Sequence, residues 1–387
     1  MTGGIRVTMR IKSVTFDPKP ESSRGEQQTR FAEAYAVLRQ AIASQAFPGC
    51  AFGLLVDGHV PLLDSLGDFT YEHGEAGAHA VSPDTLYDVA SLTKVVSTTS
   101  AAMLLHQRGL LDLEMPLGEL LPGFVVGRDS SEHARNVTIR HLLAHSSGLP
   151  GYVPLFQTAT TPYSVLRGCL QLPIEAEPGT RAEYSDPGFI LLGKALEAIL
   201  REELASWVRR EVFSPLSMTA SRYCPPPNMR IEIPPTEEDV LFRLRKIQGE
   251  VQDEHAFLLH GAGGHAGLFS NVPDLLRFSQ AILAPEGIAL FEPQTIGLFA
   301  QRQPPEGSSR ALGWDTPSAE SSSGHFFSHN SIGHLGYSGC SLWIDREAQL
   351  AIVLLTNRTW PHRESQQIRS VRPVFHDAIR KALLGGQ

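Results

Sequence analysis

The sequence lacks the patterns that mark several common protein classes. Its four cysteines, Cys50, Cys169, Cys224 and Cys340, lie far apart with no Cys-x-x-Cys pair, which argues against a disulfide framework or a zinc site. No apolar run of about 18 residues is present, so we expect no membrane span. Residues 1–19 are interrupted by charges and lack the apolar core of a signal peptide. These absences predict a cytoplasmic protein with free thiols.

The composition also argues against a nucleic-acid partner. The 387 residues carry 33 basic and 41 acidic side chains, a net charge of −8, so no basic surface for a polyanion is expected. The chain is 42% hydrophobic and 19% charged, which is ordinary for a globular protein. No Gly-x-Ser-x-Gly motif occurs, which argues against an α/β-hydrolase.

Two sets of histidines have partial metal-site spacing. His141 and His145 are four residues apart on an expected helix, but no glutamate follows the first of them as in His-Glu-x-x-His. His255, His260 and His265 are five residues apart, a spacing that fits no common ligand set, and at most one of them faces a cleft. We therefore expect no metal site.

The glycine-rich segment 261–266 is similar to a dinucleotide-binding fingerprint. It follows no strand of a βαβ unit, so we expect neither a nucleotide nor any other cofactor. Asp253, Glu254 and His255 lie just before this segment. They form either part of a substrate cleft or a solvated charged turn.

Hydrophobic patterning predicts strands near both ends of the chain and helices between them. The expected helices lie at 31–42, 138–145, 162–171, 187–201, 203–213, 272–284 and 371–383. The expected strands lie at 50–56, 60–66, 311–315, 326–333, 341–345 and 350–356. The pattern indicates an irregular arm (1–26), a sheet domain (27–110 and 285–387) and a mostly helical insertion (111–284) with an extended excursion at 225–240. An active site is expected at the seam between the two domains.

The segment from Tyr87 to Leu105 predicts a buried helix with one serine and one lysine near its start. Ser91 and Lys94 are three residues apart and share a helix face. Near a helix N-terminus, free backbone N–H groups favour developing negative charge. A partly desolvated lysine can be the base that a serine nucleophile needs. Alone, however, Ser-x-x-Lys is a weak pattern, because both residue types are common on helices.

A second candidate pair is Tyr184 and Asp186, which precede an expected helix. A tyrosine hydroxyl close to a lysine and a serine can relay a proton. The alternative is structural: Asp186 followed by Pro187 makes a good N-cap and first-turn pair, with Tyr184 packed beside it.

A third candidate lies in the segment from Gly333 to Asp345. Glycines at 333, 336 and 339 allow the backbone of an edge strand to approach a ligand closely. Such a strand can offer an N–H group to an oxyanion hole, and His334 can donate to the substrate or stabilise charge. The alternative is a glycine-rich turn with a surface histidine.

The order Ser91-x-x-Lys94, Tyr184-x-Asp186, His334-x-Gly336 resembles the serine β-lactamase and penicillin-binding-protein family. It is most similar to the class C β-lactamase-like branch, which includes family VIII carboxylesterases and D-amino-acid peptidases. Five longer stretches that are typical of that branch lie at 86–94, 141–150, 212–218, 264–270 and 353–357.

The resemblance implies an α+β fold and an acyl-enzyme mechanism. It implies that Ser91 is the nucleophile and that Lys94 and Tyr184 share the role of base. It also implies that Tyr184 protonates the leaving group, and that the backbone N–H groups of Ser91 and Tyr337 hold the oxyanion. Asp186, His334 and Gly336 would contact the substrate.

Three residues depart from the β-lactamase pattern. Asp186 stands where asparagine is usual, and His334 and Leu335 replace the lysine and threonine of Lys-Thr-Gly. That lysine and threonine help β-lactamases to bind the substrate carboxylate, so their absence argues against efficient β-lactam hydrolysis. Asp186 near Lys94 should favour the protonated amine and shift more of the base role to Tyr184.

The sequence thus predicts a serine hydrolase that cleaves a small ester, amide or short peptide, either esterase-like or D-amino-acid peptidase-like. One alternative is a β-lactamase, or a carboxypeptidase or endopeptidase acting on cell-wall peptides. Another is a binding protein with an idle pocket, against which the joint presence of Ser91, Lys94 and Tyr184 argues. No membrane partner is expected, and the sequence does not determine the oligomeric state.

Overall fold

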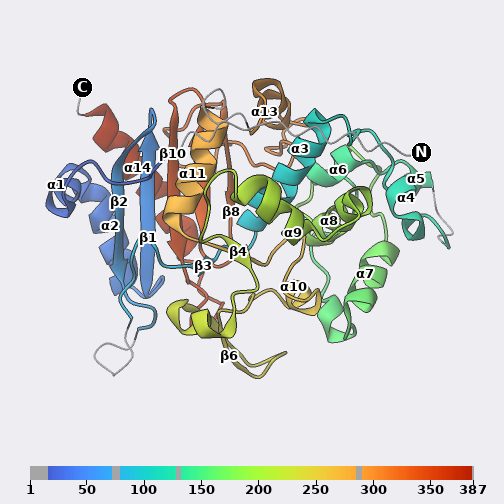
Figure 1. Ribbon diagram of the computed structural model, residues 1–387, viewed down its shortest axis with the longest axis horizontal. Helices are drawn as coiled ribbons and strands as arrows, with labels where there is room; N and C mark the ends of the chain where they lie inside the picture. Colours follow the sequence, from blue (N-terminus) through green and yellow to red (C-terminus); the bar gives the residue numbers. More distant parts are fainter. Residues whose placement is uncertain (1–15, 72–78, 128–131, 285–289, 386–387) are drawn as a thin grey trace, which may run out of the picture.

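The computed structural model describes residues 16–71, 79–127, 132–284 and 290–385. An antiparallel five-stranded sheet lies beside a mostly helical region (Figure 1). The strand order is β2-β1-β10-β9-β8. The bounds are β1 Gly49–Val56, β2 His59–Gly67, β8 Ser331–Leu335, β9 Ser341–Asp345 and β10 Leu350–Thr356. Pairing of β1 with β10 confirms the expected sheet built from both ends of the chain.

One face of the sheet is covered by helices from both ends of the chain. These are α2 (Ala32–Ala43) and α14 (Ile368–Leu384), which pack against each other and against Phe52 and Leu54 of β1. Because successive strand residues point to opposite faces, every second residue of β1 belongs to this core. The strands are buried on both faces, which is why β1 and β10 are almost continuously apolar.

The opposite face of the sheet is covered by α11 (Val272–Leu283). A side chain at Gly53 of β1 would meet Val272 at 2.6 Å, so this glycine lets α11 lie close to the sheet. The expected domain boundary at residue 284 placed this helix in the insertion, and that assignment is wrong. The expectation rested on order along the chain, whereas the apolar face of α11 is buried against β1 and β10.

The helical region confirms most of the expected elements. The first helices of the chain, apart from those on the sheet, are α1 Arg24–Arg30, α3 Ser100–Gln107, α4 Leu117–Leu120, α5 Glu132–Arg135 and α6 Ile139–Leu143. The later ones are α7 Pro162–Gln171, α8 Asp186–Leu200, α9 Leu204–Val208, α10 Glu254–Leu258 and α13 Pro293–Phe299. Thr138 caps α6 as predicted, and its hydroxyl accepts a hydrogen bond from the N–H of His141.

Two small sheets accompany the large one. One has the order β3-β7-β4, with bounds Tyr87–Asp88, Leu268–Ser270 and Arg222–Tyr223. The other pairs β5 (Pro235–Asp239) with β6 (Arg245–Gln248), so residues 235–248 form a hairpin and not the extended excursion that the prolines indicated. The expected strand 311–315 is also wrong: only single bridges form there, from Asp315 to Arg310 and to Gly333.

The cysteines are unpaired, as predicted. Cys50, Cys169 and Cys340 are buried and Cys224 is exposed. Among the described residues, no helix has the length and apolar character needed to cross a bilayer.

Candidate active site

The segment that carries Ser91 is held in an unusual turn. Ala90 has a positive φ of 47°, a conformation that a non-glycine residue adopts only when its surroundings enforce it. Its N–H donates to the Asp88 carboxylate at 2.9 Å, and the second oxygen of Asp88 accepts from the N–H of Gln252 at 2.7 Å. Ser91 therefore stands at a turn immediately before the helix, near the helix N-terminus as the sequence predicted.

Lys94 lies wholly buried at the start of a π-helical turn, η1 (Lys94–Thr99), that continues into α3. Its Nζ donates to Ser91 Oγ at 3.0 Å, to Asp186 Oδ1 at 2.6 Å and to the backbone carbonyl of His265 at 3.1 Å. These contacts use all three of its N–H groups. The amine is therefore fixed between the candidate nucleophile and a carboxylate.

The electrostatics of this contact favour the ammonium form of Lys94. Burial lowers the pKa of the amine, but the Asp186 carboxylate and the Tyr184 hydroxyl outweigh burial, so the pKa is raised overall. The direction agrees with the expectation that Asp186 holds the proton on Lys94. The ammonium also lies 4.8 Å from the centre of the Tyr184 ring, within cation–π range.

Tyr184 is positioned by the start of α8. The N-cap of this helix is Ser185, whose hydroxyl accepts from the N–H of Gly188 at 3.1 Å. The structural alternative for Asp186 is therefore wrong: Ser185 caps the helix, and Asp186 is free to bind Lys94. Burial raises the pKa of Tyr184, while the Lys94 charge and hydrogen bonding to Lys94 and Ser91 oppose this shift.

His145 supports Tyr184, a role that sequence reasoning missed. Its Nδ1 accepts from the N–H of Ser185 at 3.0 Å, and its ring lies 4.6 Å from the Tyr184 ring. His141 instead belongs to the cap of α6, where its Nδ1 accepts from the N–H of Thr138. The two histidines thus have separate structural roles, and only the contact between distant segments reveals that of His145.

His334 is buried at the inner end of the cleft, with its ring 5.8 Å from that of Tyr184. Its Nδ1 lies 2.8 Å from the Leu335 carbonyl, which can only accept, so Nδ1 carries the proton. Burial and the nearby Lys94 hold the pKa of His334 well below its usual range. With Nδ1 as the donor, Nε2 is free to accept a hydrogen bond, whereas the sequence predicted that His334 donates to the substrate or stabilises charge.

The turn after β8 lies against the nucleophile segment. A Cβ at Gly336 would lie 2.4 Å from the Val89 carbonyl oxygen, and the Ser338 hydroxyl donates to the Asp88 carbonyl at 2.7 Å. Gly336 thus allows a close approach to the protein's own backbone, where the sequence indicated an approach to a ligand. Within the described residues, the backbone N–H groups of Ser91 and Tyr337 have no hydrogen-bond acceptor.

These groups line a cleft of about 1040 Å³ between the sheet and the helical region. Ser91, Tyr184, Asp186, His334 and Gly336 all contribute to its wall.

Arg310 also lines this cleft and was not singled out from the sequence. Its guanidinium lies 5.3 Å from the centre of the Tyr184 ring, on a segment more than a hundred residues away in the chain. It therefore adds a positive charge beside the candidate proton-transfer residue.

Comparison with known proteins decides the family. The model of the Beta-lactamase family matches residues 35–372, which is most of the chain. The chain belongs to the beta-lactamase family. It is 30% identical over 350 residues to the N-acetylmuramyl-L-alanine amidase of Bacillus subtilis (strain 168), covering 81% of this chain and 77% of that protein.

Other relatives of this beta-lactamase family member differ in their named activities. It is 28% identical over 346 residues to a Salmonella typhimurium (strain LT2) protein named "Putative D-alanyl-D-alanine carboxypeptidase", covering 82% of this chain and 79% of that one. The solved structure of EstCE1, a hydrolase with promiscuous acyltransferase activity, superposes with a TM-score of 0.71 at 22% identity, covering 92% and 99% of the two chains. The fold and the serine hydrolase class that the sequence predicted are confirmed.

The structure changes one further conclusion about the histidines. The five-residue spacing of these histidines fitted no ligand set. In the structure, however, His255 and His265 lie with Asp253 in one cluster beside the cleft. His260 is exposed. The glycine-rich segment between them is needed for packing: a Cβ at Gly264 would lie 2.3 Å from the Phe189 carbonyl oxygen.

Proposed function

We propose that this protein hydrolyses small esters or D-amino-acid amides through an acyl-enzyme on Ser91. The observation that carries the proposal is the contact of Lys94 Nζ with both Ser91 Oγ and Asp186 Oδ1 at the base of the cleft. A serine held by a buried amine, in a member of the beta-lactamase family, is suited to nucleophilic attack. An idle binding pocket gives no reason to bury that lysine.

The proposed reaction starts from the enzyme form in which Tyr184 has lost its proton to solvent and Lys94 is an ammonium. Ser91 Oγ attacks the substrate carbonyl carbon while the serine proton passes to the Tyr184 phenolate. The carbonyl oxygen becomes an oxyanion, which accepts from the free N–H groups of Ser91 and Tyr337. The tetrahedral intermediate then breaks its bond to the leaving group, which takes a proton from Tyr184. Water attacks the acyl-enzyme in the same way and releases the acid and Ser91.

The assignment of the base follows from the charges. Asp186 holds the proton on Lys94, so the amine is a poor acceptor near neutral pH. Lys94 then serves as a cation that stabilises the Tyr184 phenolate when it forms, and Tyr184 takes the larger share of the proton transfer. Positioned proton-transfer groups of this kind contribute about 10²- to 10⁴-fold in rate.

The substrate preference follows from His334 and Leu335. The buried, neutral His334 offers no cation and Leu335 no hydroxyl, so this edge of the cleft does not favour a substrate carboxylate. Arg310 is the cation that lines the cleft beside Tyr184. We therefore place nitrophenyl esters and D-amino-acid amides, which lack that carboxylate, ahead of β-lactams. A cytoplasmic site of action stays a prediction, supported by the four free cysteines.

A panel of substrates tests this preference. We expect short-chain nitrophenyl esters and D-alanine amides to give a higher kcat/KM than a cephalosporin, measured by absorbance and by release of D-alanine. Each activity is to be measured in parallel on the wild type and on Ser91→Ala. Turnover of the cephalosporin alone would show that the predicted preference is wrong.

A second prediction concerns pH. Asp186→Asn removes a negative charge that raises the pKa of both Lys94 and Tyr184, so the Tyr184 phenolate forms at lower pH. The rising limb of kcat/KM against pH should move to lower pH by about 1 unit or more. The matched control is Glu320→Gln, because Glu320 is an exposed carboxylate of the same cleft. An unchanged profile in Asp186→Asn contradicts the proposed control of Lys94 by Asp186.

A further inference from the structure

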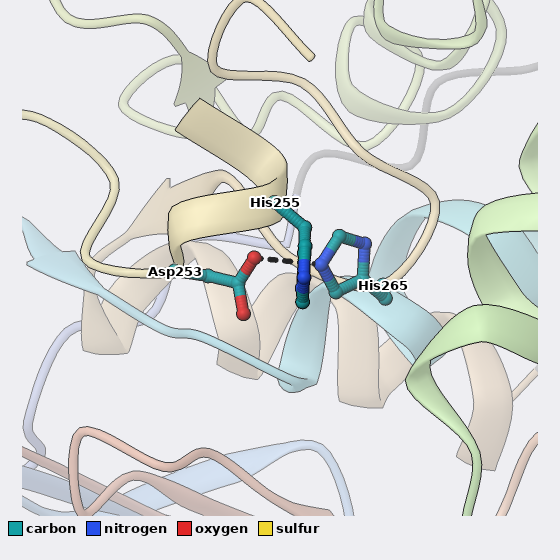
Figure 2. A group of neighbouring side chains, drawn as sticks. All are labelled: Asp253, His255 and His265. Carbon is teal, nitrogen blue, oxygen red and sulfur yellow. Dashed lines mark hydrogen bonds and ion pairs between the residues drawn. The ribbon is translucent and has the colours of Figure 1, made fainter. Parts of the chain in front are cut away.

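A cluster of three potential metal ligands lies beside the proposed active site. Asp253 caps α10, His255 lies in its first turn, and His265 lies just before β7. One ligand atom from each residue lies within 4.8 Å of those of the other two. Figure 2 shows Asp253 and His255 extending from the start of α10 towards the His265 ring.

The cluster contains buried nitrogen atoms without partners. His255 is 2% exposed, and neither of its ring nitrogens has a hydrogen-bond partner in the part of the chain that the structure describes. Buried polar atoms in folded proteins nearly always have a partner, and leaving one unpaired is destabilising. A nitrogen of this imidazole is therefore free to coordinate an ion.

The other two residues are arranged to complete such a site. His265 Nε2 lies 2.8 Å from Asp253 Oδ1, and a carboxylate beside a histidine nitrogen needs only a small displacement for both to bind one ion. Asp253 Oδ1 also accepts from the N–H of Ala256 at 2.7 Å, which fixes the carboxylate. Its Oδ2 has no hydrogen-bond partner among the described residues, and Asp253 lines the cleft, so an ion can enter from there.

A purely structural role explains only part of this arrangement. The ring of His255 packs 5.6 Å from that of Tyr152 and 5.8 Å from that of Phe156, so its faces are in apolar contact. A phenylalanine would make those contacts without burying two nitrogens. The contact between Asp253 and His265 orients the loop that carries His265, whose backbone carbonyl accepts a hydrogen bond from Lys94. This contact does not involve His255.

We propose that Asp253, His255 and His265 bind one divalent transition-metal ion of the zinc class. Two imidazole nitrogens and one carboxylate oxygen are ligands that zinc prefers, whereas calcium and magnesium prefer oxygen alone. Tetrahedral zinc places its ligand atoms about 3.4 Å apart, so the three ligand atoms, which lie within 4.8 Å of one another, need only small displacements to bind one ion. Burial lowers the pKa of His255, which keeps the imidazole neutral and able to coordinate.

Metal binding itself tests the proposal, so its outcome does not depend on hydrolysis. The full chain, without a polyhistidine tag, is freed of metal with a chelator and titrated with Co²⁺ and Zn²⁺. We expect one ion per chain, an intense visible Co²⁺ spectrum of tetrahedral type that Zn²⁺ displaces, and a rise in Tm on adding Zn²⁺. Ca²⁺ and Mg²⁺ should produce none of these changes.

Three variants separate this site from adventitious binding. His255→Asn and Asp253→Asn should each weaken Zn²⁺ binding by about 100-fold or more, because loss of an outer partner alone costs about 10- to 100-fold. The matched control, His260→Asn, removes an exposed histidine five residues away and should bind as the wild type does. Circular dichroism confirms that each variant is folded. The proposal is wrong if wild-type protein binds less than one ion, or if folded His255→Asn binds Zn²⁺ with unchanged affinity.

Discussion

Ser91→Ala is expected to lower kcat/KM for every substrate that the wild type hydrolyses by at least about 10⁴-fold. The reason is that, in the described chain, Ser91 Oγ is the serine hydroxyl that accepts a hydrogen bond from Lys94 Nζ. Without Ser91 Oγ, no covalent intermediate forms. The measurement is steady-state kinetics on the best ester of the panel, together with labelling by a fluorophosphonate probe and mass spectrometry of the labelled peptide.

Ser321→Ala is the matched control for this variant. Ser321 lines the same cleft, but its hydroxyl accepts from Ser323 and has no contact with Lys94. We expect this control to keep its activity and its labelling at Ser91. Undiminished hydrolysis by folded Ser91→Ala, or labelling of the wild type at another serine, contradicts the assignment of the nucleophile.

Lys94→Met is expected to lower kcat by about 10³-fold or more and also to destabilise the fold. The amine supplies the charge that stabilises the Tyr184 phenolate, and methionine fills a similar volume without it. Removing one partner of a buried ion pair leaves the other uncompensated, and Asp186 is only 19% exposed. We expect a loss of about 2–4 kcal/mol in the free energy of unfolding, measured by urea denaturation.

A double variant separates catalysis from stability. Lys94→Met with Asp186→Asn removes both charges, so most of the lost stability should return. Activity should not return, because the cation is still absent. A double variant that recovers both stability and activity would show that Lys94 acts only on folding. If the single variant Lys94→Met keeps full activity, Lys94 has no part in the mechanism.

Patterns among residues that are close together in the chain were enough to predict most of the helices and strands. The apolar runs 50–56 and 350–356 predicted the two central strands, which are β1 and β10. Thr138 predicted the cap of α6, because capping depends on residues within one turn. Ser91, Lys94 and Tyr184 were also identified from the sequence, through their order and through longer stretches around them.

Other features depended on contacts between distant segments. Helix α11 has an ordinary amphipathic pattern, and only the folded chain shows that its apolar face packs on β1 and β10. The unprotonated Nε2 of His334 follows from the position of the Leu335 carbonyl, which no spacing in the sequence determines. His145 contacts the Tyr184 ring although the two lie on separate segments.

The sequence by itself determined the fold class, the central strands and the proposed nucleophile and lysine. These depend on periodicity, capping and short motifs, and each involves residues close together in the chain. Only the tertiary structure decided that His334 presents an acceptor, and that His255 and His265 meet beside Asp253. The physical reason is that a protonation state or a ligand set depends on which groups fold into contact, and the path of the backbone between them decides that.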